Sequence, residues 1–211
     1  MKELLRNIVA NDYLHSKWLN TLSFMENCGA RKISACEELS FTNIIQLKHA
    51  AEEHRHAYYL KKQLQKLNVP GFEYYTKSNL LAGYSSIQYL NRLDVAVCRY
   101  LKELINLEGS SLKYASYLFV TYAIELRADE LYPIYQEVLT EHQSRVVVKS
   151  IILEEEGHLE EMIMQLQRFS KDWEFHANEI LLLENELFHA WVIQLKNEVI
   201  EEKNNRNVLA Q

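Results

Sequence analysis

The sequence predicts an all-α protein in which two antiparallel helical hairpins, joined by a crossover helix, form a four-helix bundle. Apolar residues recur at intervals of three and four along most of the 211 residues, which is the spacing of a buried helix face. Five glycines and two prolines leave few places where a helix can turn. Hydrophobic residues make up 48% of the chain and charged residues 25%, as expected for a single globular domain over residues 1–211.

Six helices are expected, with the approximate ranges 2–38, 41–68, 79–107, 111–139, 141–169 and 173–202. The segment NVPGF after the second helix is the clearest stop signal, and Gly109 follows the third. Ser110 or Ser111 can cap the fourth helix, and Asp172 the sixth. Thr140 and Gln143 form a capping box for the fifth. The polar segment 203–211 is expected to be a frayed tail.

Short connections near residues 39–40 and 139–140 predict that helices one and two, and helices four and five, form antiparallel hairpins. The third helix then crosses from one hairpin to the other. Helices three and six are the two additional helices outside the four-helix bundle.

Charge and composition exclude several classes of protein. The formal net charge of -6 offers no overall basic surface, so a constitutive nucleic-acid binder is not indicated. Cys28, Cys36 and Cys98 form no Cys-x-x-Cys motif and predict no disulfide framework, which fits a reducing cytoplasm. No run of about 18 apolar residues is present, so we expect no membrane span and no signal peptide.

Glu-x-x-His places a carboxylate and an imidazole one turn apart on the same helix face, where both can reach one metal ion. The pairs are Glu53/His56, Glu155/His158 and Glu186/His189, against about one expected by chance from the composition. The first two pairs interrupt apolar stripes in mid-helix, where an unpartnered carboxylate would be costly to bury. The third lies off the apolar stripe of its helix and is interpreted as a surface pair.

Hairpin geometry predicts two more carboxylates, because residues at equal depth in an antiparallel pair are symmetric about the turn. Reflecting Glu53 through position 39.5 gives Glu26, and reflecting Glu155 through Thr140 gives Glu125. Both glutamates lie on apolar stripes of their own helices. Glu130 is the alternative to Glu125, since Pro133 can change the register of that helix.

One Glu from each of two helices and one Glu-x-x-His from each of two others resemble the ligand set of ferritin-like di-iron or di-manganese carboxylate proteins. The resemblance implies a ferritin-like fold with six metal ligands: Glu26, Glu53, His56, Glu125, Glu155 and His158. It also implies that Glu53 and Glu155 bridge the metals. Two stretches, AAEEHRHAYYL at 50–60 and AIELRADEL at 123–131, are similar to bacterial di-iron hydroxylases that act on prenylated adenosine in tRNA.

The expected function is that of a di-iron oxidase or monooxygenase that uses O2, with manganese as the alternative metal. Its substrate would be a small molecule or a modified nucleoside, and an oxygenase would need an electron donor. A nucleic-acid substrate is not supported by the charge. A homodimer is possible. The alternatives are a ferroxidase or other iron-handling protein, and a metal-free helical interaction protein.

Residues near the predicted ligands are candidates for secondary roles. His49 and His54 are expected to support the ligands or lie on the surface, as are Glu154 and Glu156. Tyr59 and Tyr122 each lie one helical turn from a predicted ligand, close enough to shape a pocket or carry electrons, although core packing is the commoner role of such tyrosines.

Overall fold

The computed structural model describes residues 1–38 and 40–209, and the side chains of these residues except 156 and 206–209. Within this part of the chain every regular element is helical, which confirms the all-α prediction. Seven α-helices and one 3-10 turn are present in the described residues: α1 (Lys2–Val9), α2 (Asp12–Ala35), α3 (Ile44–Gln65), η1 (Lys77–Asn79), α4 (Gly83–Leu104), α5 (Gly109–Glu141), α6 (Lys149–Phe169) and α7 (Trp173–Leu209).

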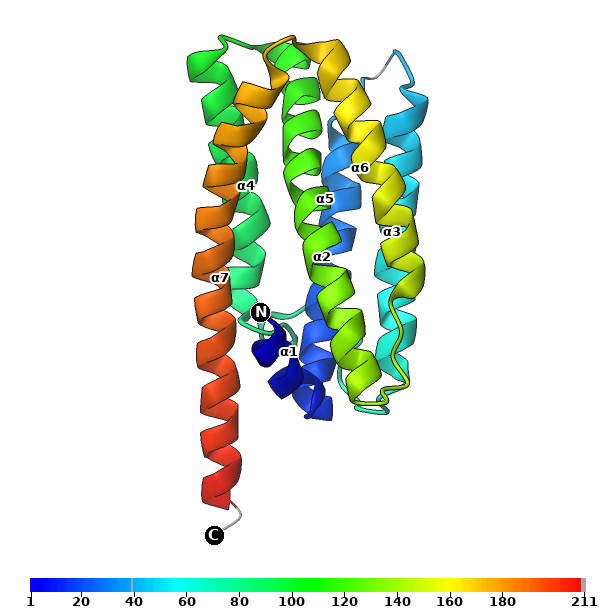
Figure 1. Cartoon of the computed structure of the whole chain (residues 1–211), viewed down its shortest axis with the longest axis vertical. Coiled ribbons are helices and arrows are strands. Elements are labelled where there is room, and N and C mark those ends of the chain that lie inside the picture. The colour runs from blue at the N-terminus through cyan, green and yellow to red at the C-terminus, as the bar shows by residue number, and fades with distance from the viewer. Residues whose placement is uncertain (39, 210–211) are drawn as a thin grey trace.

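Two antiparallel helix pairs form the body of the molecule. α2 packs along α3, α5 packs along α6, and the two pairs lie against each other (Figure 1). α4 connects the pairs and packs against α5 and α7 on one side of the molecule. The C-terminal end of α7 projects beyond the other helices (Figure 1).

The first predicted helix is divided in two. The chain bends at Ala10 and Asn11, and the Asn11 side chain accepts hydrogen bonds from the backbone N–H groups of Tyr13 and Leu14. This is the capping geometry of a new helix, and α2 therefore begins at Asp12. The prediction of one continuous helix from Lys2 was wrong because an asparagine inside an amphipathic pattern can cap a helix without altering the pattern. α1 packs against α2, α5 and α7.

The first hairpin has the predicted symmetry. α2 ends at Ala35 and α3 begins at Ile44, so the midpoint of the connection is (35 + 44)/2, or 39.5. Asn43 caps α3 through the N–H groups of Ile45 and Gln46. Glu26 and Glu53 therefore lie at the same depth of the bundle.

The second hairpin turns later than predicted. α5 continues to Glu141, and Thr140 Oγ1 donates to Gln136 O instead of capping a new helix. The capping box was therefore a wrong prediction. Residues 142–148 form an irregular connection that runs back along α5, and Val148 N already donates to Gln136 Oε1 at 2.8 Å. An extended residue covers about 3.3 Å and a helical one about 1.5 Å. The connection therefore spans the same length along the bundle as a larger number of helical residues in α5.

Two other boundaries differ from expectation. α5 begins at Gly109 without a side-chain cap, so neither Ser110 nor Ser111 caps it. Gly109 has φ +57°, a left-handed conformation that glycine adopts without strain. α7 begins directly after Asp172, as predicted, but continues past Glu202 to Leu209. Most of the expected tail is therefore helical, and residues 210–211 lie outside the described part.

The core consists of two apolar clusters, one toward each end of the bundle. Leu22, Leu60, Leu131 and Ile151 belong to one cluster, and Ile33, Ala50, Leu118 and Met162 to the other. All four bundle helices thus contribute to both clusters, and on each helix a polar stretch separates the two. Among the described helices none is both long and apolar enough to cross a bilayer.

A buried histidine makes the fold sensitive to acid. His15 is 1% exposed, and its Nε2 lies 2.6 Å from Tyr135 Oη. Burial, with His142 nearby, lowers the pKa of His15 from 6.5 to about 4. A pKa that is lower in the folded state stabilises the fold above pH 6.5, and this contribution is lost as the pH falls toward 4.

We predict that His15→Gln removes part of this acid sensitivity, because the neutral amide can keep a hydrogen bond to Tyr135. Between pH 6.5 and 4 the variant should lose less unfolding free energy than the wild type, by on the order of 3 kcal/mol. Urea unfolding at both pH values measures this difference. His189→Gln, on the exposed face of α7, is the control and should follow the wild type. Equal losses in the wild type and His15→Gln would contradict the assignment.

Candidate metal centre

The polar stretches between the two apolar clusters meet in one layer at the centre of the bundle. They form two groups of four side chains, and within each group the candidate ligand atoms lie within 4.8 Å of one another. Glu53 and Glu155 belong to both groups and occupy the shared positions. The first group is completed by Glu26 and His56, and the second by Glu125 and His158.

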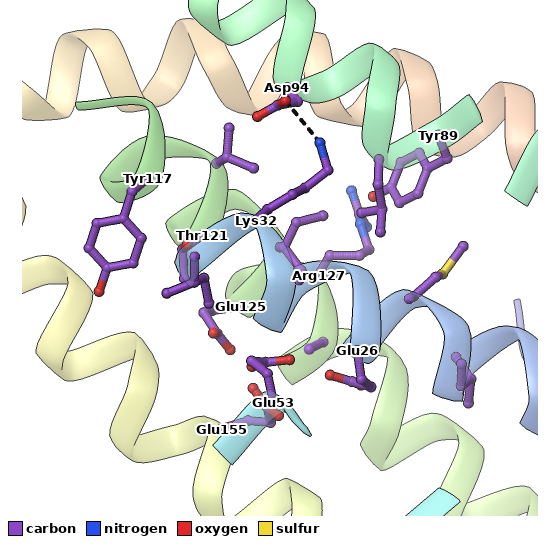
Figure 2. A pocket seen from close by; sticks show the side chains of 18 of the residues that line it. Glu26, Lys32, Glu53, Tyr89, Asp94, Tyr117, Thr121, Glu125, Arg127 and Glu155 are labelled. Carbon is purple, nitrogen blue, oxygen red and sulfur yellow. Dashed lines mark hydrogen bonds and ion pairs between the residues drawn. The ribbon is translucent and has the colours of Figure 1, made fainter. Parts of the chain in front are cut away.

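Each bundle helix supplies its part of the layer from its middle turns. α2 and α5 each contribute one glutamate, and α3 and α6 each contribute a Glu-x-x-His pair. The four carboxylates lie next to one another on one side of a cavity (Figure 2). The structure therefore brings together all six residues that the sequence predicts as ligands.

Both imidazoles turn Nδ1 toward the carboxylates. His56 Nδ1 lies 3.0 Å from Glu155 Oε1 and 3.9 Å from Glu26 Oε2. His158 Nδ1 lies 3.6 Å from Glu125 Oε1 and 3.9 Å from Glu53 Oε1. Of the five buried side-chain polar atoms without a hydrogen-bond partner in the described residues, three belong to this layer: His56 Nδ1, His158 Nδ1 and Glu155 Oε1.

Unsatisfied buried polar atoms are rare, and three of them facing one small volume require an explanation. Metal ions would satisfy all three, because imidazole nitrogens and carboxylate oxygens are metal ligands. One imidazole and several carboxylates per site suit Fe(II) or Mn(II) better than zinc or copper. The residues present thus fit a pair of divalent metal ions.

The outer nitrogen of each imidazole is held by a carboxylate from the opposite hairpin. His56 Nε2 donates to Glu154 Oε2 at 2.7 Å, and His158 Nε2 donates to Glu52 Oε2 at 2.8 Å. Each of these glutamates directly precedes the glutamate of a Glu-x-x-His pair and holds the histidine of the other pair. Such outer contacts fix the ring and its tautomer, so that Nδ1 is free to bind a metal.

Glu154 was predicted to support the ligands or to lie on the surface, whereas the contact made by Glu52 was not predicted. The signal was the doubled glutamate in EExxH, which occurs in both motifs. Arg55 extends the network, because its guanidinium donates to both oxygens of Glu154 at 2.8 and 2.7 Å. The side chain of Glu156 lies outside the described ones.

A second polar layer lies behind His158. His49 is fully buried, and its Nε2 donates to Glu161 Oε2 at 2.8 Å while its Nδ1 accepts from Tyr117 Oη at 3.1 Å. The ring centroids of His49 and His158 are 4.9 Å apart. His49 therefore supports the candidate centre, whereas His54 is exposed on the surface.

The crowding of carboxylates shifts the pKa values of the layer. Burial, reinforced by the neighbouring carboxylates, raises the pKa of Glu53 and that of Glu125 well above the usual range. Burial opposes the charged form of His56, but Glu155 and Glu26 outweigh it and raise the pKa of His56 to about 9. His158 has a pKa of about 11 for the same reason, with Glu125 and Glu155 as partners. Protons therefore compensate the layer when metal is absent, and four carboxylates would balance two divalent cations.

The other candidate residues from the sequence lie outside the layer. Glu130 is exposed and pairs with Arg127 at 2.5 Å, so Glu125 and not Glu130 joins the layer. Tyr59 donates to Val147 O, and Tyr122 packs against Trp173. The tyrosine that reaches the layer is Tyr132, which donates a hydrogen bond to Glu26. The surface pair Glu186/His189 is exposed, as predicted.

We predict that Glu52→Gln and Glu154→Gln each weaken metal binding by about 10- to 100-fold, because a neutral amide is a poorer partner for the outer imidazole nitrogen. Competition between the protein and a coloured chelator for Mn(II) measures the change. Glu160→Gln, on the exposed face of α6, is the matched control and should bind like the wild type. Unchanged affinity in both outer-glutamate variants would contradict a role for these contacts in metal binding.

Comparisons with protein-family models, characterised proteins and solved structures bring no match to this chain. The candidate metal centre therefore rests on the six converging side chains, their unsatisfied inward atoms and the crossed outer carboxylates.

Proposed function

We propose that the protein is a ferritin-like, dinuclear iron oxidase or monooxygenase that activates O2, with manganese as the alternative metal. The observation that carries the proposal is the pair of inward imidazole nitrogens that lack a hydrogen-bond partner and face four carboxylates, three of them buried. Structural buried Glu-His pairs normally satisfy each other, so this arrangement favours a site that binds cations.

The helix arrangement supports the ferritin-like assignment. In that fold two antiparallel hairpins are joined by a crossover, and metal ligands project inward as one Glu from each of two helices and one Glu-x-x-His from each of the others. α2 with α3 and α5 with α6 correspond to the hairpins, and α4 lies on the crossover. α1 and α7 are additions to this plan.

The chain's own contribution is to position the ligands and to surround them with apolar side chains. Glu53 and Glu155 occupy positions from which one carboxylate can hold both metals, and Glu52 and Glu154 orient the imidazoles. The apolar clusters above and below place the layer in surroundings of low polarity, which strengthens electrostatic interactions within it.

When bound, the two metals would supply the activation of O2. As a monooxygenase, the protein would insert one oxygen atom into a C–H bond and release the other as water. That balance requires two electrons and two protons, so a separate electron donor is a necessary partner.

We predict that the protein purified without chelator contains about two iron or manganese ions per chain, as set by the two ligand groups. Glu53→Ala and Glu155→Ala should each lose both ions, because each residue belongs to both groups. Elemental analysis gives the stoichiometry. Glu186→Ala is the matched control, because it disrupts the exposed Glu-x-x-His pair on α7, and it should keep the wild-type content. Protein that is metal-free and also refuses Fe(II) under anaerobic conditions would overturn the proposal in favour of a metal-free helical protein.

We further predict that oxidation of added Fe(II) by O2 stops at about two ions per chain, because an oxygenase keeps its metals in place. An oxygen electrode with stepwise addition of Fe(II) measures the end point. Continued oxidation well beyond this number, together with a large assembly on a sizing column, would instead identify a ferroxidase or storage protein.

A further inference from the structure

A cavity of about 110 Å³ extends from the candidate metal centre toward α4. Its lining includes all four glutamates of the centre, whereas neither His56 nor His158 takes part. Figure 2 shows the four carboxylates on one side of the cavity and Lys32, Asp94 and Tyr89 on the other. The carboxylates thus lie between the imidazoles and the cavity, so metal ions held by these residues would border the cavity.

The walls between these two sides are predominantly apolar. They come mainly from α2, α4 and α5, with Trp191 from α7, and include Leu22, Met25, Ile33, Leu90 and Ile124. At the far side Lys32 and Asp94 are 31% and 38% exposed, so the cavity meets solvent between α2 and α4. Gly29 adds room beside the centre, because a Cβ there would lie 3.5 Å from Glu53 Oε2.

The charged side chains that line the cavity outside the carboxylate layer are paired with other side chains of the protein. Lys32 Nζ donates to Asp94 Oδ2 at 2.8 Å across the mouth. Arg127 donates to the two oxygens of the buried Glu184 at 3.0 and 2.6 Å, and Tyr89 donates to the same carboxylate. Glu184 holds Arg127 from α7, outside the lining. Neither cation is therefore available to a ligand without breaking an existing pair.

The charge at the inner end of the cavity is also compensated if the proposed function is correct, because the charges of four carboxylates and two divalent cations sum to zero. A cation in this cavity would lose its hydration without gaining an opposite charge. An anion could recover that loss only by coordinating a metal whose charge the four carboxylates already balance, so both kinds of ion are disfavoured. An uncharged apolar ligand would instead gain from contact with the aliphatic walls.

We infer that the part of the substrate that reaches the metal centre is uncharged and apolar. It is either a small hydrocarbon-like molecule or the apolar end of a larger one, and it enters beside Lys32 and Asp94. The inference rests on the proposed function for the role of this group as substrate. The cavity limits its size, because an apolar cavity of about 150 Å³ in another protein accommodates one benzene molecule.

Three probes that share one ring but differ in charge test the inference: toluene, benzoate and benzylammonium. Mn(II)-loaded protein provides the readout, because bound Mn(II) accelerates the proton relaxation of any ligand held beside it. Toluene should show strong, saturable enhancement and bind at least about tenfold more tightly than either ion. Benzoate or benzylammonium binding as tightly as toluene would overturn the inference.

A substitution that fills the cavity provides a second test. Ala128 lines the cavity on α5, and Ala128→Leu should weaken toluene binding by about tenfold or more. Ala190→Leu, the same change on the exposed face of α7, should leave binding unchanged. Wild-type toluene affinity in Ala128→Leu would overturn the inference, and the comparison of probes in the wild type does not depend on either variant folding.

Failure of the proposed function gives a different pattern. Protein that takes up no Mn(II) by elemental analysis contradicts the metal centre. The shift in melting temperature that each of the three probes produces on the same sample then shows whether the cavity prefers toluene to the two ions. Protein that loads about two Mn(II) but does not prefer toluene keeps the metal centre and loses the substrate class.

Discussion

The structure depends on one constraint: six ionisable side chains, five of them buried and Glu26 partly buried, share a single layer between two apolar clusters. Burying one uncompensated carboxylate costs several kcal/mol, and three of the four carboxylates in this layer are buried. Each bundle helix continues the apolar clusters on both sides of the layer, so the buried charges lie in apolar surroundings. The layer must be compensated by protons or by metal, and its compensation is therefore coupled to the packing of the whole bundle.

The same layer joins the two hairpins. α3 and α6 face each other through crossed ionic contacts, in which Glu52 reaches His158 and Glu154 reaches His56. Arg55 and Lys48 extend these contacts to Glu154 and Glu161 on the outer surface. Because each hairpin orients a histidine of the other, a shift of one hairpin along the other would disturb both halves of the candidate site. Geometry at the centre is thus tied to the register of the bundle.

The two halves of the site were predictable for different reasons. Glu26 follows from the symmetry of a connection whose midpoint lies at 39.5. Glu125 was identified from a turn at Thr140, although the midpoint between Glu141 and Lys149 is (141 + 149)/2, or 145. Reflection through Thr140 nevertheless led to Glu125. The irregular segment 142–148 covers more distance per residue than a helix, and this compensates for the later turn. The sequence left Glu130 open as the alternative, and the structure places Glu130 on the surface beside Arg127.

The sequence by itself determined the all-helical class and the buried position of the two central Glu-x-x-His pairs, because helical periodicity is a local property that survives in the linear pattern. It also separated the exposed pair on α7 from the buried ones. Only the tertiary structure decided which carboxylate holds which imidazole, that Tyr132 contacts Glu26, and that Glu184 compensates Arg127 beside the cavity. These contacts join residues more than fifty positions apart, and no local pattern records the partner that a side chain meets across a bundle.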